Sequence, residues 1–343
     1  MRAAVTERAG AMAVLDRPEP SEPEAHEVVV APEAVGICGS DYHFFAGELS
    51  EEAGGSEFPR VQGHEIGARI VAVGPGCRRE LTVGTRVALW PLQACGECYP
   101  CSVGRPNTCD AFELIGIHVD GGLQERLSVP EEQVFPIRAD DPAVASLAEP
   151  VSIAVRAVNR ARVQRGERVV VLGAGPIGQC ICLVARERGA RVLAVDLQEN
   201  RLEVSQAMDA ETLLWTSADD VVAFARRWAR PAGPPVVFDA TGAPPAVRAM
   251  VEMVASAGRA VQVGMSGDDV TFRLGVLTEK EIDLLGVSCC GAAEFGQAVA
   301  VVERNPELLG RLVSHRFGLA QAPEALRFAM ENPTEVMKVV IGG

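Results

Sequence analysis

Four of the ten cysteines of this 343-residue chain lie within fifteen positions, in the stretch ACGECYPCSVGRPNTC from Ala94 to Cys109. Cys95, Cys98, Cys101 and Cys109 follow the spacing C-x2-C-x2-C-x7-C. Such closely spaced thiolates suit a tetrahedral zinc ion, in a closed site that leaves no position for a substrate. An iron–sulfur cluster, a redox centre and a disulfide staple are the alternatives. Because disulfides are rare in intracellular proteins, we interpret the cysteines first as thiols or metal ligands.

Three other stretches carry the residue types of a catalytic metal site. They are GICGSDYHFF, QGHEIG and LAEPVSIA, and their polar residues are Cys38, Ser40, Asp41, His43, His64, Glu65 and Glu149. A catalytic zinc needs three protein ligands and one open position, and a thiolate, an imidazole and carboxylates from scattered loops suit it. Taken singly, a buried cysteine, a core histidine or a surface glutamate is the simpler interpretation of each. Their combination with a nucleotide-binding motif favours the metal site.

That motif is the stretch VVVLGAGPIGQC, which has the spacing GxGxxG between an apolar run and a helical pattern. Its glycines permit a tight turn and close approach of the backbone to a pyrophosphate. The residues expected to bind the cofactor there are Gly173, Gly175, Pro176, Ile177 and Gly178. Asp196 ends the next apolar run, where a carboxylate binds the adenosine ribose hydroxyls and repels a 2′-phosphate, so we expect NAD. Arg201 could instead bind a 2′-phosphate, and a glycine-rich turn that binds nothing is the remaining alternative.

The elements that must position these residues change character near residue 150. Earlier segments such as EVVVAPEAVGI and EIGARIVAVGPG are β-branched runs separated by Gly and Pro, a pattern typical of an irregular β-barrel. From residue 168 onward, apolar strands alternate with helical stretches, which predicts a doubly wound parallel sheet. We therefore predict an α/β protein with a β-rich domain of residues 1–149 and 288–343, a cysteine lobe at about 91–112, and an inserted nucleotide-binding domain at 150–287.

Composition limits the partners of the chain. Its formal net charge of -14 argues against nucleic acid or an anionic membrane surface as a partner. No apolar run approaches the roughly 20 residues that span a bilayer. The first residues, MRAAVTERAGAMAV, lack the apolar region of a signal peptide, so we expect a cytoplasmic protein.

In these motifs and their order, the chain resembles the zinc-dependent medium-chain dehydrogenase/reductase superfamily, and most closely its polyol and sugar-acid dehydrogenases. The shared features are GICGSD, GHE, the four-cysteine lobe, EP, GAGPIG and the closing KVVI. The resemblance implies a GroES-like β-barrel catalytic domain, a Rossmann NAD-binding domain and one catalytic and one structural zinc per chain. It also implies a homo-oligomer, with a tetramer favoured over a dimer.

Residue by residue, the resemblance assigns Cys38 and His64 as ligands of the catalytic zinc. It leaves Glu65 and Glu149 as alternatives for the remaining ligand, or as ligands that exchange. Asp41 is expected to orient His64. By the same resemblance Ser40 takes the proton of the substrate and His43 passes it to solvent, while Cys95, Cys98, Cys101 and Cys109 hold the structural zinc.

The substrate implied by the resemblance is a sugar acid of the hexonate type, galactonate or gulonate, oxidised at a secondary hydroxyl to a ketone. Sorbitol-like polyol specificity is weakened because Cys289 stands where such enzymes often carry an arginine. A polyol or simple secondary alcohol remains the alternative substrate, and a non-enzymatic NAD-binding protein is the remote one. His118, Phe44 and Trp90 are candidate pocket residues or core residues, and segment 46–60 is a candidate lid or a solvated loop.

Overall fold

The computed structural model describes residues 1–49 and 55–342, and the chain forms two compact units. The first unit combines Met1–Ser152 with Cys290–Gly343, and the second is Ile153–Cys289. Two segments far apart in the sequence therefore build the first unit, and the second is inserted between them. No helix among the described residues is long and apolar enough to cross a membrane.

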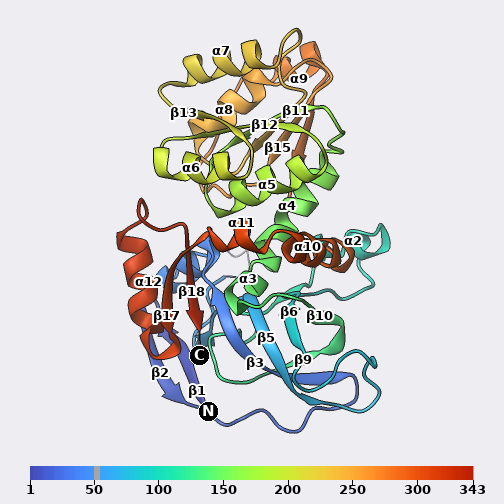
Figure 1. The fold of residues 1–343 in the computed structure, drawn as a ribbon, viewed down its shortest axis with the longest axis vertical. Coiled ribbons are helices and arrows are strands. Elements are labelled where there is room, and N and C mark those ends of the chain that lie inside the picture. The colour runs from blue at the N-terminus through green and yellow to red at the C-terminus, as the bar shows by residue number, and fades with distance from the viewer. Residues whose placement is uncertain (50–54, 343) are drawn as a thin grey trace. The chain divides into compact units, whose positions relative to one another are not determined.

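The first unit is built on β-sheets. One has the strand order β10-β6-β5-β3-β18-β17, with β9 also paired to β3. Its strands are β3 (Glu27–Gly36), β5 (Glu65–Val73), β6 (Arg86–Leu89), β9 (Leu127–Pro130), β10 (Val134–Pro136), β17 (Val313–Gly318) and β18 (Lys338–Gly342). A second sheet has the order β2-β1-β4, from β1 (Arg2–Arg8), β2 (Ala11–Asp16) and β4 (Arg60–Val61), and β7 (Leu92–Gln93) pairs with β8 (Glu113–Leu114). Figure 1 shows β3, β5 and β6 side by side in this unit.

Strand β3 lies at the centre of the larger sheet and brings both ends of the chain to one place. Its apolar side chains, Val28 and Val30 among them, are buried in a core shared with β1, β5 and β18. At its end, Gly36 pairs with Glu65 of β5 on one side and with Val340 of β18 on the other. The end of β3 therefore joins the GHE segment to the closing strand.

Helix α1 (Gly39–Ala46) follows β3 directly. Cys38 has extended backbone geometry, and Asp41 in the first turn accepts the backbone N–H of Cys38, which is a reciprocal cap. The helix ends at Gly47, whose φ of 76° is the left-handed conformation that glycine adopts readily. The other helices of this unit are α2 (Tyr99–Ser102), α3 (Pro142–Ser146), α10 (Ala292–Arg304), α11 (Pro306–Gly310) and α12 (Ala322–Glu331), while α4 (Ala148–Arg160) contains the boundary between the units.

The second unit is a doubly wound parallel sheet, as the sequence predicts. Its strand order is β13-β12-β11-β14-β15-β16, and each pairing is parallel. The strands are β11 (Arg168–Leu172), β12 (Arg191–Asp196), β13 (Glu211–Leu214), β14 (Val236–Asp239), β15 (Arg259–Gln262) and β16 (Asp283–Gly286), and the helices are α5 (Pro176–Glu187), α6 (Glu199–Ala207), α7 (Ala218–Trp228), α8 (Pro244–Met253) and α9 (Gly275–Lys280). Strand order reverses between β11 and β14, which is where ligands bind in such sheets.

Candidate functional site

Cys38, His64 and Glu65 form a buried group of metal-ligand atoms in the first unit. Cys38 precedes α1, His64 immediately precedes β5, and Glu65 is the first residue of β5. One ligand atom from each of the three lies within 4.8 Å of the other two. The exposed fractions of His64 and Glu65 are 3% and 0%. A sulfur, a nitrogen and an oxygen donor in this arrangement could hold a zinc ion and leave one coordination position open.

Glu65 is held by a buried lysine that sequence reasoning missed. The Lys338 amine donates to Glu65 Oε1 at 2.6 Å and to the carbonyl oxygen of Ile37 at 3.0 Å. The second carboxylate oxygen, Oε2, is buried and has no hydrogen-bond partner among the described residues. A Cβ at Gly36 would lie 2.1 Å from this oxygen, so any larger residue there would displace the carboxylate. One oxygen of Glu65 is therefore fixed by Lys338 and the other remains available for a ligand.

The Asp41 carboxylate contacts the backbone of Cys38 and lies near the imidazole of His64. It is fully buried, and its Oδ2 accepts the Cys38 backbone N–H at 2.9 Å. Its Oδ1 is 3.8 Å from Nδ1 of His64, which is buried and has no hydrogen-bond partner in the described part of the chain. Histidines that bind metals usually donate their other ring N–H to a carboxylate. Asp41 is placed to take that role for His64.

Glu149, in the first turn of α4, lies outside the group of three ligand atoms. It is nonetheless close enough to interact electrostatically with His64 and Glu65. Burial raises the pKa of Glu149 to about 7, and the proximity of His64 opposes this rise. Of the two glutamates that the sequence left as alternatives, Glu65 has a carboxylate oxygen in the group with Cys38 and His64, and Glu149 does not.

These donors fit a divalent cation. Burial alone lowers the pKa of His64, but Asp41, Cys38 and Glu149 raise it well above its ordinary value. A concentration of buried anionic groups that draws a proton onto an imidazole also favours a metal ion, which competes with that proton. The available oxygen of Glu65 and the thiol of Cys38 complete a set that suits zinc.

Ser40 and His43 both lie on α1, close in sequence to Cys38. Ser40 is half-buried, and His43 is exposed with its Nδ1 3.7 Å from Glu48 Oε2. A half-buried hydroxyl two residues from Cys38 and an imidazole open to water on the same helix are suitable ends for a proton path.

The four cysteines of the lobe converge as their spacing predicts. One sulfur from each of Cys95, Cys98, Cys101 and Cys109 lies within 4.8 Å of the other three. Backbone N–H groups of Glu97 and Cys98 lower the pKa of Cys95 to about 7. Among the described residues no disulfide forms, and such a sulfur cluster favours a metal over separate thiols. The lobe carries four sulfur donors and no open position, which is the composition of a structural zinc site.

The glycine-rich turn of the second unit connects β11 to α5. Gly173 has a φ of 92°, and a Cβ at Gly178 would lie 1.8 Å from the carbonyl oxygen of Gly173, so both positions require glycine. Gly175 precedes α5, whose first residues Pro176 and Ile177 are half-buried. This leaves the backbone of the turn open at the start of a helix, where a pyrophosphate binds.

Asp196, at the end of β12, is tied to the same turn. Its Oδ2 accepts the backbone N–H of Ala174 at 2.7 Å, and its Oδ1 accepts that of Gln198 at 2.9 Å. A Cβ at Gly175 would be 4.0 Å from Nη1 of Arg201, so this guanidinium also lies over the turn. The structure thus places both the carboxylate expected to select NAD and the arginine of the alternative beside the glycine-rich turn.

The candidate pocket residues have other partners. Phe44 is fully buried against Phe58, with ring centroids 5.2 Å apart. The indole N–H of Trp90 donates to the carbonyl oxygen of Cys290 at 3.1 Å. His118 accepts the backbone N–H of Leu114 at 3.0 Å, which fixes its ring in a turn. Residues 50–54 of the candidate lid lie outside the described residues.

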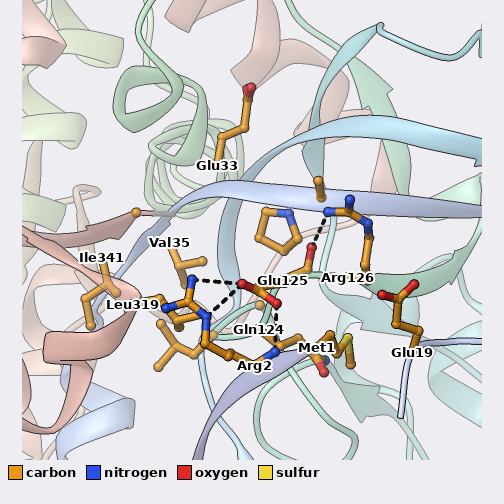
Figure 2. Close-up of a pocket in the computed structure, with 15 residues that line it drawn as sticks. Met1, Arg2, Glu19, Glu33, Val35, Gln124, Glu125, Arg126, Leu319 and Ile341 are labelled. Carbon is orange, nitrogen blue, oxygen red and sulfur yellow. Dashed lines mark hydrogen bonds and ion pairs between the residues drawn. The ribbon is translucent and has the colours of Figure 1, made fainter. Parts of the chain in front are cut away.

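A cavity of about 420 Å³ in the first unit does not involve the metal donors (Figure 2). Arg2, Glu33, Glu125 and Arg126 line it, and none of the candidate metal ligands is among its described lining residues. Both of its arginines have partners: Arg2 Nε donates to Glu125 at 2.9 Å, and Arg126 donates to the Glu125 carbonyl oxygen at 2.8 Å. The buried donor group, rather than this cavity, is therefore the candidate catalytic site.

Comparison with known proteins places the chain in a family. Residues 24–139 match the alcohol dehydrogenase GroES-like domain, and residues 176–304 match the zinc-binding dehydrogenase domain. The L-galactonate-5-dehydrogenase of Escherichia coli K12 is 33% identical over 319 residues, which cover 93% of this chain and 92% of that protein. The chain therefore belongs to the zinc-dependent medium-chain dehydrogenase/reductase superfamily, the zinc-type alcohol and polyol dehydrogenases.

Solved structures agree with this assignment and differ in their nucleotide. The short chain alcohol dehydrogenase RspB of Escherichia coli CFT073, complexed with NADH, is 28% identical with a TM-score of 0.89, covering 100% of this chain and 99% of that one. A putative zinc-binding dehydrogenase of Sinorhizobium meliloti bound to NADP is 29% identical with a TM-score of 0.90 and the same coverage. The GroES-like and Rossmann fold predicted from the sequence is confirmed.

Proposed function

We propose that the protein oxidises a secondary hydroxyl of a sugar acid to a ketone and transfers the hydride to NAD. The observation that carries this proposal is the buried group of Cys38, His64 and Glu65 in a chain that also has the glycine-rich turn. Zinc bound there would act as a Lewis acid that lowers the pKa of the substrate hydroxyl. The nicotinamide cofactor supplies the redox chemistry, and the protein supplies binding and orientation.

The residues of this chain divide the remaining work. Cys38, His64 and Glu65 hold the metal, and Glu149, which is close enough to interact electrostatically with His64 and Glu65, serves the reaction without holding the metal. Ser40 takes the proton of the substrate hydroxyl, and His43 passes it to water because its imidazole is exposed. The lobe cysteines Cys95, Cys98, Cys101 and Cys109 hold a second zinc that serves the fold.

NAD is the proposed cofactor because Asp196 presents a carboxylate at the ribose position beside the turn. A fixed negative charge there disfavours the 2′-phosphate of NADP. Arg201 would favour NADP, because a guanidinium can bind the 2′-phosphate. The Asp196 carboxylate, however, is held beside the turn by the backbone N–H groups of Ala174 and Gln198, so its negative charge stays at the ribose position.

The substrate class is supported by the L-galactonate-5-dehydrogenase relative. A polyol is the alternative, since a polyol and a sugar acid offer the same secondary hydroxyl and differ only in the carboxylate. We also propose that the protein is a homotetramer rather than a homodimer. The mass of the native protein in solution tests this, because a tetramer has four times the chain mass of 36.3 kDa.

Reduction of NAD with a panel of hexonates, polyols and secondary alcohols tests the function. We expect turnover with at least one hexonate, and none after Cys38→Ser, which should bind NAD nearly as well as the natural protein. Cys77→Ser is the matched control. Cys77 is a half-buried thiol that donates a hydrogen bond to the Glu27 carbonyl oxygen, and it does not belong to the group of Cys38, His64 and Glu65. No turnover with any compound, together with no more than one zinc per chain, would overturn the proposal.

The choice of third ligand has its own test. Glu65→Gln should release the catalytic zinc, whereas Glu149→Gln should retain the zinc and lower turnover. The opposite pattern of metal content would assign the ligand role to Glu149.

A further inference from the structure

Gln62, the residue before Gly63 and His64, has a fully buried side chain between two segments of the first unit. Its Oε1 accepts a hydrogen bond of 2.6 Å from the hydroxyl of Thr6, which is also fully buried. Its Nε2 donates to the backbone carbonyl oxygen of Asp41 at 2.8 Å and lies 3.4 Å from Oδ1 of the same residue. Gln62 therefore links strand β1 to helix α1.

The chemistry of the neighbours fixes which way the amide points. The atoms of Asp41 that face Gln62 are both acceptors, a carbonyl and a carboxylate oxygen. Only the amide NH₂ can satisfy them, so Oε1 must face the hydroxyl of Thr6. Thr6 is itself held in place, because the backbone pairing of β1 with β4 sets it opposite Arg60. The orientation of the amide is thus determined at both ends.

Asp41 transmits this restraint to the metal donors. Its carboxylate accepts the backbone N–H of Cys38 and lies 3.8 Å from Nδ1 of His64. That nitrogen has no hydrogen-bond partner among the described residues. A shift of this carboxylate away from His64 would release the orientation of the imidazole. Gln62 contacts both the backbone carbonyl oxygen and the carboxylate of Asp41 and so restrains both.

We propose that Gln62, fixed by Thr6, is a positioning residue of the metal site: it holds Asp41 so that the Asp41 carboxylate orients His64 toward the metal. This inference rests on the proposed function, because it presupposes zinc at Cys38, His64 and Glu65. It adds two residues, one of them from the first strand of the chain, to the determinants of metal affinity. Loss of a group that orients a metal-binding histidine typically weakens metal binding by about tenfold or more.

The test measures zinc affinity of the full-length protein by competition with a chromophoric chelator. Gln62→Leu and Thr6→Val should each weaken binding of the catalytic zinc by about tenfold, whereas Thr6→Ser, which keeps the hydroxyl, should restore the natural affinity. The four-cysteine zinc should be retained in every variant. After cobalt replaces the catalytic zinc, Gln62→Leu should also change the visible absorption spectrum, which reports ligand geometry.

Gln179→Leu is the matched control. Gln179 is fully buried in the second unit, where its Oε1 accepts from Ser205 and its Nε2 donates to the Ala174 carbonyl oxygen. Gln179 thus has the same kinds of partners as Gln62, and none of the candidate metal ligands lies in its unit. The control should lose thermal stability as the Gln62 variant does, but keep the affinity for zinc.

Two outcomes separate this inference from the function on which it rests. A second zinc that binds Gln62→Leu and Thr6→Val with unchanged affinity would overturn the inference alone. The absence of a second zinc from the natural protein would overturn the proposed function, and the inference with it. If Gln62→Leu does not fold, the comparison of Thr6→Val with Thr6→Ser gives the decision.

Discussion

The Lys338 amine lies 2.6 Å from Glu65 Oε1, and both side chains are buried. The lysine pKa is raised: burial opposes the ammonium form, but Glu65 and Cys38 more than compensate. Removing one partner of a buried ion pair is costly, because the other charge is left without compensation. The pair therefore has a structural role in addition to fixing one oxygen of the Glu65 carboxylate.

Lys338→Met should lower the free energy of unfolding of the metal-free protein by about 3–5 kcal/mol. The double variant with Glu65→Gln should recover part of that loss, because no carboxylate remains unpaired. Calorimetry of the single and double variants measures the coupling between the two residues. Strictly additive losses would show that the ion pair contributes nothing of its own.

Cys98→Ser should remove one zinc per chain and lower the thermal unfolding temperature, because the lobe folds around its metal. The turnover number of the folded fraction should remain within about twofold of the natural value, since a closed four-thiolate site takes no part in the chemical step. Metal analysis and steady-state kinetics on the same samples check both expectations. A large loss of turnover in fully folded protein would contradict the structural role.

Asp196→Ser should raise the ratio of NADP to NAD use by about tenfold, which corresponds to roughly 1.4 kcal/mol of relieved charge repulsion. Asp196 also accepts the backbone N–H groups of Ala174 and Gln198, so binding of both nucleotides should weaken somewhat. Asp196→Asn also removes the charge but keeps an acceptor oxygen, so it should raise the ratio with less loss of nucleotide binding. An unchanged ratio of kcat/KM values would count against the ribose role of Asp196.

Asp141→Asn should reduce stability in a manner that depends on pH. Asp141 caps helix α3 through the Ala143 N–H at 2.9 Å, and its carboxylate pairs with Arg316 of β17. Hydrogen bonds from Arg316 lower the pKa of Asp141 in the folded protein. The carboxylate therefore stabilises the fold above its unfolded pKa of about 3.9, and this contribution disappears as the pH falls through the lower folded value.

Asp141 and Arg316 are partly exposed. We therefore expect the free energy of unfolding of Asp141→Asn to be about 1 kcal/mol lower than that of the natural protein above pH 5. Urea unfolding between pH 3 and pH 7 measures it, and Arg316→Gln should remove much of the same contribution. A difference between Asp141→Asn and the natural protein that stays constant down to pH 3 would contradict the assignment.

Sequence spacing was sufficient for the elements and residues that lie close together in the chain. The glycine-rich turn between β11 and α5 and the convergence of four cysteines follow from short motifs whose backbone geometry is local. The parallel sheet was predictable because its buried strands alternate regularly with helices. Phe44 illustrates the limit, since a pocket residue and a core residue have the same sequence pattern and only packing distinguishes them.

The surroundings of the metal donors were not predictable from sequence. Lys338 is 273 residues from Glu65, and Thr6 is 56 residues from Gln62, so only the pairing of strands brings these partners together. The sequence does contain one sign that Lys338 is unusual. The chain has only two lysines, and the other 30 residues in its Lys+Arg total are arginines. The compact ammonium group of Lys338 fits at the end of β3, where it donates hydrogen bonds to Glu65 and to the Ile37 carbonyl oxygen.

The placement of Lys338 in β18 also sets an order of events during translation. Cys38, His64 and Glu65 leave the ribosome early, but the counter-charge of Glu65 follows only after the whole inserted unit of residues 153–289 has been made. Domains generally fold as units while synthesis proceeds. The nucleotide-binding unit can therefore fold before strand β18 of the first unit has been synthesised. A nascent chain that stops before residue 338 would contain Cys38, His64 and Glu65 but not the lysine that balances the charge of Glu65.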